Sequence, residues 1–194
     1  MHISKCKLCT DIHSHLNILK EKYPNYFCQP ISGSGSFFSK ICLIGLAPGL
    51  HGANKTGIPF TSDFSGNVIR SLLKELEIED IFITNAVRCY PKKNKPNAKV
   101  INNCQRHNDT EINKLKNIKI IITLGSVAYY QILKLYNICG NSNKFVHGNI
   151  IKLNKKISLI SSYHCSKLNF NTKRIDKDML KEIFIKAKKA ASNG

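Results

Sequence analysis

Four cysteines in this chain have types and spacing suited to a metal or iron-sulfur site. Cys6 and Cys9 form a C-x-x-C pair near the N-terminus, and Cys89 and Cys104 follow far along the chain, fifteen positions apart. Thiolates are ligands for both Zn²⁺ and iron-sulfur clusters. The two pairs can share one centre only if the N-terminal arm folds back onto the body. On spacing alone, zinc and a [4Fe–4S] cluster are equally favoured, and unrelated buried cysteines are the alternative.

The remaining four cysteines, at positions 28, 42, 139 and 165, raise the question of a disulfide framework. The first residues contain no apolar stretch that could serve as a signal peptide. A chain of 194 residues can also build a core without covalent cross-links. We therefore expect reduced cysteines and a cytoplasmic protein.

The charge of the chain is strongly unbalanced. It carries 30 Lys and Arg residues against 12 Asp and Glu residues, a formal net charge of +18. A Lys-, Asn- and Ile-rich proteome is one explanation, but such a bias would also supply Glu. The shortage of acids favours a polyanionic partner, with nucleic acid ahead of a membrane surface because no amphipathic anchor stands out. No apolar run approaches the roughly 20 residues of a membrane-spanning helix.

The elements that position these residues follow an alternating pattern. Strands are expected at residues 41–45, 80–84 and 119–124, with a hairpin from 144–152 into 157–161, and helices at 13–23, 65–77, 98–116, 126–136 and 176–190. This alternation predicts an α/β three-layer αβα sandwich with a mostly parallel sheet. We expect one domain over residues 1–194, in which a cysteine-bearing arm (1–36) is linked by a flexible joint at 33–36 to an α/β core (37–194).

Three long polar segments follow predicted strands, at residues 45–66, 85–96 and 163–174. In parallel sheets, ligands bind beyond the carboxyl ends of the strands. The three segments should therefore form a single site.

These segments resemble the motifs of a known family. GLAPGLHGANKTGIPFTSDFSG, NAVRC followed by P-x-x-NKP, and the late H-x-S-x-x-N-x-x-T-x-R are similar to those of the family 5, or type B, uracil-DNA glycosylases of bacteria and archaea. The resemblance covers nearly the whole chain in order. It implies a central four-stranded, mainly parallel sheet, excision of uracil from DNA, and tolerance of other deaminated bases such as hypoxanthine. The cysteines resemble the family's ligands for a structural [4Fe–4S] cluster, which leaves zinc less favoured.

A glycosylase must extrude the damaged nucleotide and hold its base in a pocket. Phe60, in a Gly- and Pro-rich turn, is the candidate stacking face, since a base on an aromatic ring gains roughly 1–3 kcal/mol; an ordinary core phenylalanine is the alternative. Asn85 can accept from uracil N3–H and donate to O4, a pattern opposite to that of cytosine. Its alternative role is to cap a turn.

Two further residues are candidates for the chemistry. His164 resembles the family's motif histidine, which would donate to uracil O2 as negative charge develops there. Asp63 matches the acid proposed in family 5 to orient the attacking water, and its alternative role is the N-cap of the next helix. Relatives outside family 5 carry an acid where this chain has Leu46. Leu46, His51 and Asn54 are further candidates for binding the substrate in the pocket. The histidines at 2, 13, 15, 107 and 147 are expected at the surface or in the arm.

The third segment should contact DNA. Leu168 resembles the wedge leucine that fills the gap left by the extruded base, and Phe170 could share that task. Backbone contacts are expected from Lys167, Asn169 and Arg174, together with Lys92, Lys93, Lys95 and Lys173. Cys165 stands where the family usually has proline, so the loop after His164 is expected to be less rigid.

Two other functions fit parts of the pattern. Leu46 at the usual acid position is compatible with a catalytically silent, cluster-bearing protein that binds nucleic acid. A zinc-ribbon protein that binds RNA is disfavoured because ribbons usually carry two close C-x-x-C pairs. The expected partner is DNA containing uracil or another damaged base, with no membrane, and the default oligomeric state is a monomer.

Overall fold

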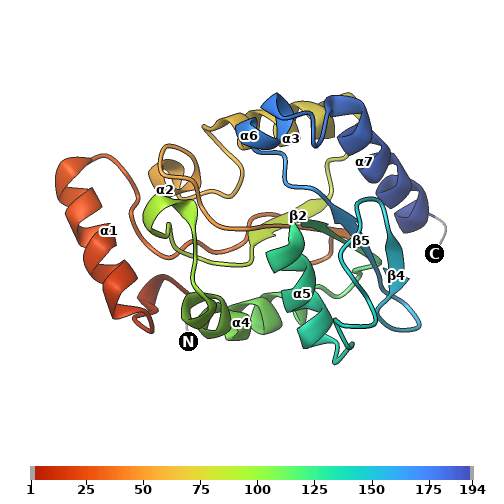
Figure 1. The fold of residues 1–194 in the computed structure, drawn as a ribbon, viewed down its shortest axis with the longest axis horizontal. Helices are drawn as coiled ribbons and strands as arrows, with labels where there is room; N and C mark the ends of the chain where they lie inside the picture. Colours follow the sequence, from red (N-terminus) through yellow and green to blue (C-terminus); the bar gives the residue numbers. More distant parts are fainter. Residues whose placement is uncertain (1–2, 193–194) are drawn as a thin grey trace.

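The computed structural model describes residues 3–192 and is built around one sheet of five strands (Figure 1). The strands are β1 (Ile41–Gly45), β2 (Ile81–Asn85), β3 (Ile120–Leu124), β4 (Ile150–Lys152) and β5 (Ser158–Ser162), in the order β2-β1-β3-β5-β4. Four of them are parallel, and β4 pairs antiparallel with β5 at the edge. The predicted three-layer, mainly parallel α/β fold is confirmed, with five strands where four were expected.

Helices cover both faces of the sheet. They are α1 (Thr10–Lys22), α2 (Ala53–Thr56), α3 (Phe64–Glu75), α4 (Ala98–Ile112), α5 (Ser126–Leu135), α6 (Lys167–Asn171) and α7 (Lys177–Ser192), with 3₁₀ turns η1 (Ile3–Lys5) and η2 (Lys92–Asn94). In Figure 1, α3 and α7 lie on one side of the sheet, and α4 and α5 on the other. The sequence pattern missed α2 and α6 because four- and five-residue helices are too short to display an apolar period.

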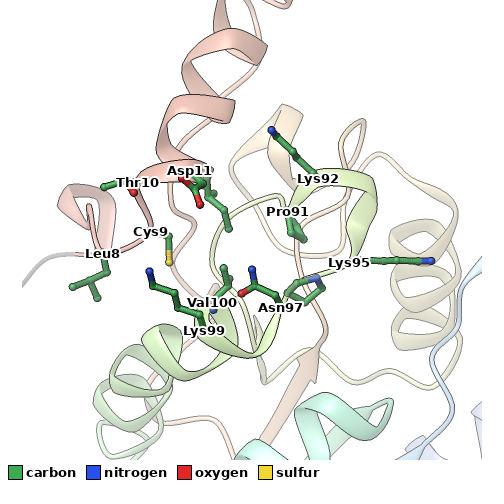
Figure 2. Close-up of a pocket in the computed structure, with 12 residues that line it drawn as sticks. Leu8, Cys9, Thr10, Asp11, Pro91, Lys92, Lys95, Asn97, Lys99 and Val100 are labelled. Atoms are coloured by element: carbon green, nitrogen blue, oxygen red, sulfur yellow. Dashed lines mark hydrogen bonds between the residues drawn. The ribbon is translucent and has the colours of Figure 1, made fainter.

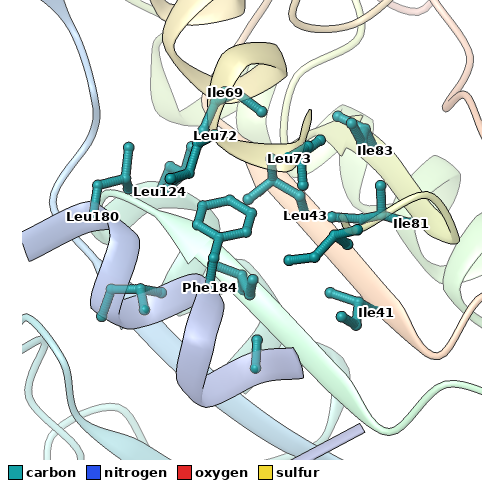
Figure 3. Close-up of a cluster of buried hydrophobic side chains, with 14 of the residues drawn as sticks. Ile41, Leu43, Ile69, Leu72, Leu73, Ile81, Ile83, Leu124, Leu180 and Phe184 are labelled. Carbon is teal, nitrogen blue, oxygen red and sulfur yellow. The ribbon is translucent and has the colours of Figure 1, made fainter. Parts of the chain in front are cut away.

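Alternate residues of the parallel strands enter two cores. In β1, Leu43 packs with α3 and α7, whereas Cys42 and Ile44 pack with α4 and α5. Figure 3 shows the first core, in which the Phe184 ring of α7 lies among side chains of α3 and the sheet. Because both faces are covered, every residue of β1, β2, β3 and β5 is buried, which is why β1 and β3 read as nearly continuous apolar runs.

The N-terminal arm packs against the body through a third core. Ile12, Leu16 and Leu19 of α1 contact a cluster that includes Val87 and Val100. The flexible joint expected at residues 33–36 is not observed. The Gly33 N–H donates to Glu111 Oε1 at 2.8 Å, and the backbones of Ser34 and Ile83 bond reciprocally at 2.8 and 2.7 Å. This segment is therefore held against the edge of the sheet at β2.

A buried ion pair fixes the segment that follows β2. Arg88 Nη1 lies 2.7 Å from Glu111 Oε2, and the two side chains are 1% and 6% exposed. Glu111 also accepts from the Thr84 hydroxyl at 3.0 Å, and Arg88 Nη2 donates to Asn108 Oδ1 at 2.6 Å. These contacts tie the chain after β2 to α4. No helix within residues 3–192 is long and apolar enough to span a membrane.

Glu111→Gln should lower the free energy of unfolding by about 3–5 kcal/mol, because it leaves the Arg88 charge buried without its partner. Urea denaturation followed by circular dichroism measures the loss. The double variant Arg88→Met/Glu111→Leu removes both charges and should recover part of it. Glu75→Gln, which breaks the surface pairs with Lys177 and Lys181, is the matched control and should change little. Equal stability of Glu111→Gln and the wild type would contradict this account.

Candidate active site

A pocket at the carboxyl ends of β1, β2 and β5 collects residues from all three polar segments. It is lined by Ala47, Pro48, Gly49, Ala53, Phe60, Asp63, Ser65, Asn85, Asn94 and His164. Phe60, Asp63, Asn85 and His164, which sequence reasoning assigned to base binding and catalysis, thus share one pocket although they lie up to about a hundred positions apart. The expected convergence follows from the parallel register, which brings these strand ends to one edge.

The Phe60 ring and the Asn85 amide meet over Gly45, the last residue of β1. A Cβ at position 45 would lie 2.5 Å from Phe60 Cζ and 2.6 Å from Asn85 Oδ1, so a side chain there would displace both groups. Phe60 is only 7% exposed, so it packs in the core, and its side chain also lines the pocket. The floor of the pocket therefore combines an aromatic face with an amide edge.

The backbone of Phe60 is held in an unusual conformation. Its φ is +54°, in the left-handed region that non-glycine residues rarely adopt. The Arg70 guanidinium of α3 donates to the Phe60 carbonyl at 3.2 Å and to the Pro59 carbonyl at 3.0 Å. Helix α3 thus holds the turn that presents the aromatic ring.

Asp63 combines two roles through its two carboxylate oxygens. Oδ1 accepts the Gly66 N–H at 2.7 Å and caps the N-terminus of α3. Oδ2 faces the chain at Gly49 and Gly52, where a Cβ on position 49 would lie 2.6 Å from it and one on position 52 closer still. Burial raises the pKa of Asp63, and the Gly66 hydrogen bond opposes that rise. The second oxygen is available at the pocket wall.

His164 is partly buried directly after β5, and burial lowers its pKa to about 4. The imidazole is therefore neutral near pH 7 and keeps one N–H to donate. Asn169 Nδ2 donates to the His164 carbonyl at 2.7 Å, and Ser65 Oγ donates to the Cys165 carbonyl at 3.0 Å. These two bonds hold the loop that carries Cys165. Burial raises the pKa of the Cys165 thiol to about 12, so it stays protonated.

Three candidate residues of the first motif, Leu46, His51 and Asn54, are not among the residues that line this pocket. The His51 ring nitrogen Nδ1 lies 2.9 Å from the Tyr26 hydroxyl, and Asn54 is fully buried with its amide directed at Cys28 Sγ, 3.4 Å away. The Leu46 carbonyl accepts the Val87 N–H at 2.9 Å. His51 and Asn54 therefore face the arm, while Leu46 continues the pairing of β1 with the chain after β2.

Sequence reasoning did not single out Asn94 and Ser65 as pocket residues. Asn94 belongs to the NKP motif and has a φ of +55°, which directs this part of the loop toward the pocket. The NKP motif was the sequence signal that could have identified Asn94 as a pocket residue. His107, expected at the surface, is 3% exposed, because the buried face of α4 packs it against the arm. His2 lies outside the described residues.

The candidate DNA-contacting residues surround α6. Leu168 is 71% exposed and Lys167 is exposed, as a wedge and a phosphate contact require. The Arg174 guanidinium lies 4.7 Å from the centre of the Tyr163 ring, and Phe170 packs edge-on against Phe64 at 5.3 Å. Leu168, the exposed apolar side chain of α6, thus lies only four positions after the pocket residue His164.

The four cysteines of the two pairs line one small cavity between the arm, the chain after β2, and α4. Cys6, Cys9, Cys89 and Cys104 share it with His107. His107 Nε2 lies 3.2 Å from Cys6 Sγ, and Asn103 Nδ2 donates to Cys9 Sγ at 3.3 Å. Within residues 3–192, no group of three or more His, Cys, Asp or Glu side chains is close enough to hold a single metal ion.

Comparisons with known proteins agree with this geometry. A sequence model of the uracil DNA glycosylase superfamily matches residues 32–188. The type-5 uracil-DNA glycosylase of Thermus thermophilus is 34% identical over 180 residues, which is 86% of this chain and 82% of that protein. The type-5 enzyme of Mycobacterium tuberculosis is 31% identical over 212 residues, covering 97% of this chain and 79% of that protein. A type-4 uracil-DNA glycosylase of Saccharolobus solfataricus is 31% identical over 170 residues, with coverages of 84% and 76%.

The match spans the sheet, all three strand-end segments and most of α7. Similarity to the type-5 relatives extends over most of both chains. The chain therefore belongs to the uracil-DNA glycosylase superfamily and, within it, to the type-5 uracil-DNA glycosylases.

Proposed function

We propose that this protein excises uracil from DNA by hydrolysing the N-glycosidic bond, leaving an abasic site. The observation that carries the proposal is the meeting of Phe60, Asp63, Asn85 and His164 in one pocket of a chain that belongs to this superfamily. Each of these side chains has a chemistry that the reaction needs.

Base recognition would depend on the floor of the pocket. The Phe60 ring offers a stacking face, and the Asn85 amide can pair with uracil N3–H and O4. A fixed amide orientation excludes cytosine, whose donor and acceptor are reversed. Asn85 is 4% exposed at the end of β2, and this burial supports such a fixed orientation. Hypoxanthine also presents an N–H beside a carbonyl oxygen, so we include it as a further substrate.

Bond cleavage would use the two titratable residues at the wall. As the glycosidic bond breaks, the uracil takes the electron pair and the sugar becomes cationic. The neutral His164 imidazole would donate to O2 of the leaving base, and the Asp63 carboxylate would stabilise the cation and orient the water. The water oxygen would then bond to C1′, and the proton it releases would neutralise the uracil anion. In its half-buried position, the charge of the Asp63 carboxylate acts more strongly on the cation than it would in water.

We further propose that Cys6, Cys9, Cys89 and Cys104 hold a [4Fe–4S] cluster. Four thiols that line one cavity fit this group, and the resemblance of the four cysteines to the family's cluster ligands favours it over zinc. The group would supply structure, by joining the arm to the chain after β2 and to α4. The four cysteines would anchor it, and the pocket residues carry the reaction.

Asp63→Asn should abolish excision while leaving the fold intact. Asn caps a helix as well as Asp does, but it lacks the charge, so turnover should fall by about 10²–10⁴-fold. The assay is alkali cleavage of a uracil-containing oligonucleotide under single-turnover conditions, with thermal unfolding of the same samples. Asp176→Asn, at the residue that accepts the Met179 N–H at the start of α7, is the matched control and should retain full activity. Wild-type turnover in Asp63→Asn would exclude the assigned role, and an inactive wild type that binds DNA would favour the catalytically silent alternative.

The excision rate should depend on pH through Asp63. Because burial raises its folded-state pKa above the usual range of aspartate, the carboxylate is protonated and the rate falls as pH drops through that raised value. His164, with a pKa of about 4, should add no inflection between about pH 5 and 8. A single-turnover pH profile at constant ionic strength tests both points. A rate that rises on acidification would contradict them.

Protein purified without oxygen should show the broad absorption near ~400 nm of an iron-sulfur cluster with thiolate ligands. Cys89→Ser should lose most of that absorption and the bound iron. Cys139→Ser, at an exposed cysteine outside the cavity, should retain both. Stoichiometric zinc in a colourless protein would refute the cluster and support the alternative metal.

A further inference from the structure

A second cavity of about 290 Å³ lies next to the cysteine-lined cavity, with Cys9 in the wall of both (Figure 2). One wall is the first turn of α1, around Thr10 and Asp11. The other is the chain from Pro91 to Val100, which includes η2 and the start of α4. The cavity is open to solvent and is built from the arm and the body together. We call it the basic pocket.

Positive charge dominates the basic pocket. Lys92, Lys95 and Lys99 line it, whereas Asp11 is its single carboxylate among the residues described. All three lysines are exposed, and none makes an ion pair or a side-chain hydrogen bond within residues 3–192. Figure 2 shows Lys99 extending from α4 toward the segment that carries Cys9. In the same view Lys92 and Lys95 point in other directions, so Lys99, which lacks a protein partner within residues 3–192, is the cation best placed to meet an anion in the pocket.

The backbone of the same pocket adds hydrogen-bond donors. The N-terminus of α1 opens at its wall, and Cys9 at the N-cap makes no side-chain cap bond to the first turn. Helix α4 also begins there, but the Asn97 side chain already accepts its Val100 N–H at 2.9 Å, so the free donors come from α1. Free N–H groups at helix starts carry partial positive charge. Together with the lysines, they match the chemistry of a phosphate.

The basic pocket adjoins the active-site pocket through one loop. Asn94 lines the active-site pocket, and its neighbours Lys92 and Lys95 line the basic pocket. Lys93 and Asn94 both have a φ of +55°, and the turn they form exposes successive side chains to different sides of the loop. A strand of DNA that enters the active-site pocket can therefore continue over this loop.

We propose that the basic pocket binds a backbone phosphate of the DNA strand that carries the extruded nucleotide, a few nucleotides away from it. This assignment rests on the proposed function. It adds Lys99 and the first turn of α1 to the DNA-binding surface, neither of which the strand-end motifs contain. It also gives the arm a task, because without α1 the pocket has only one wall.

The test compares Lys99→Gln with wild type on uracil-containing single strands of two lengths. On a strand of about twenty nucleotides, KM should rise several-fold with kcat unchanged, and the slope of log binding constant against log salt should become smaller by about 0.7. On a strand with one nucleotide on each side of the uracil, the variant and wild type should be equal. Lys155→Gln, in the turn before β5 at the opposite edge of the sheet, should match wild type on both.

Two outcomes would overturn the proposal. One is an equal rise in KM on the short and long strands, which would place Lys99 in the handling of the uracil nucleotide itself. The other is an unchanged KM and an unchanged salt slope. If the iron-sulfur absorption changed at the same time, Lys99 would instead balance the charge of the four cysteines. Failure of the proposed function is separate: it leaves the wild type without excision, while length-dependent binding by Lys99 can still be measured by fluorescence anisotropy.

Discussion

The buried pair between Arg88 and Glu111 is the interaction on which both functional regions depend. Arg88 lies between Asn85, in the active-site pocket, and Cys89, in the cysteine-lined cavity. Glu111 accepts at the same time from the Gly33 N–H, where the arm joins the core. A charge buried without its partner is costly, so the arm joint, the chain after β2 and α4 hold their positions together. The pair thus holds Asn85 and Cys89 on one fixed segment of the chain.

Helix α3 plays a corresponding part on the other side of the pocket. Its N-cap is Asp63, and its Arg70 holds the carbonyls of the turn that presents Phe60. The same carboxylate therefore serves structure with one oxygen and faces the pocket with the other. Burial and the Gly66 hydrogen bond act on its pKa in opposite directions. A helix cap in this position fixes the direction of the carboxylate, which a free surface aspartate could not achieve.

The sequence predicts the strands to within one or two residues where both sheet faces are covered, because continuous apolar runs such as Ile120–Leu124 have no other stable placement. It also predicts that Asn85 and His164 meet, since parallel strand ends share an edge. It does not separate Phe60 and Asp63 from His51 and Asn54. All four lie in one irregular segment whose side-chain directions follow from left-handed backbone at residues 57, 60 and 62. Nor does it predict the partner of Arg88, which depends on how α4 docks.

The two pockets are built from different parts of the chain. The active-site pocket is built from residues 47–164 alone, whereas the basic pocket requires the first turn of α1 as its second wall. The arm reaches that position through its apolar contacts with Val87 and Val100 and through the cysteine-lined cavity. A group bound by the four cysteines would therefore act on the geometry of the basic pocket first. Phe60, Asp63 and His164 are held by α3, β5 and the loop bonds of Ser65 and Asn169, so they would feel its loss only through the segment from Asn85 to Cys89.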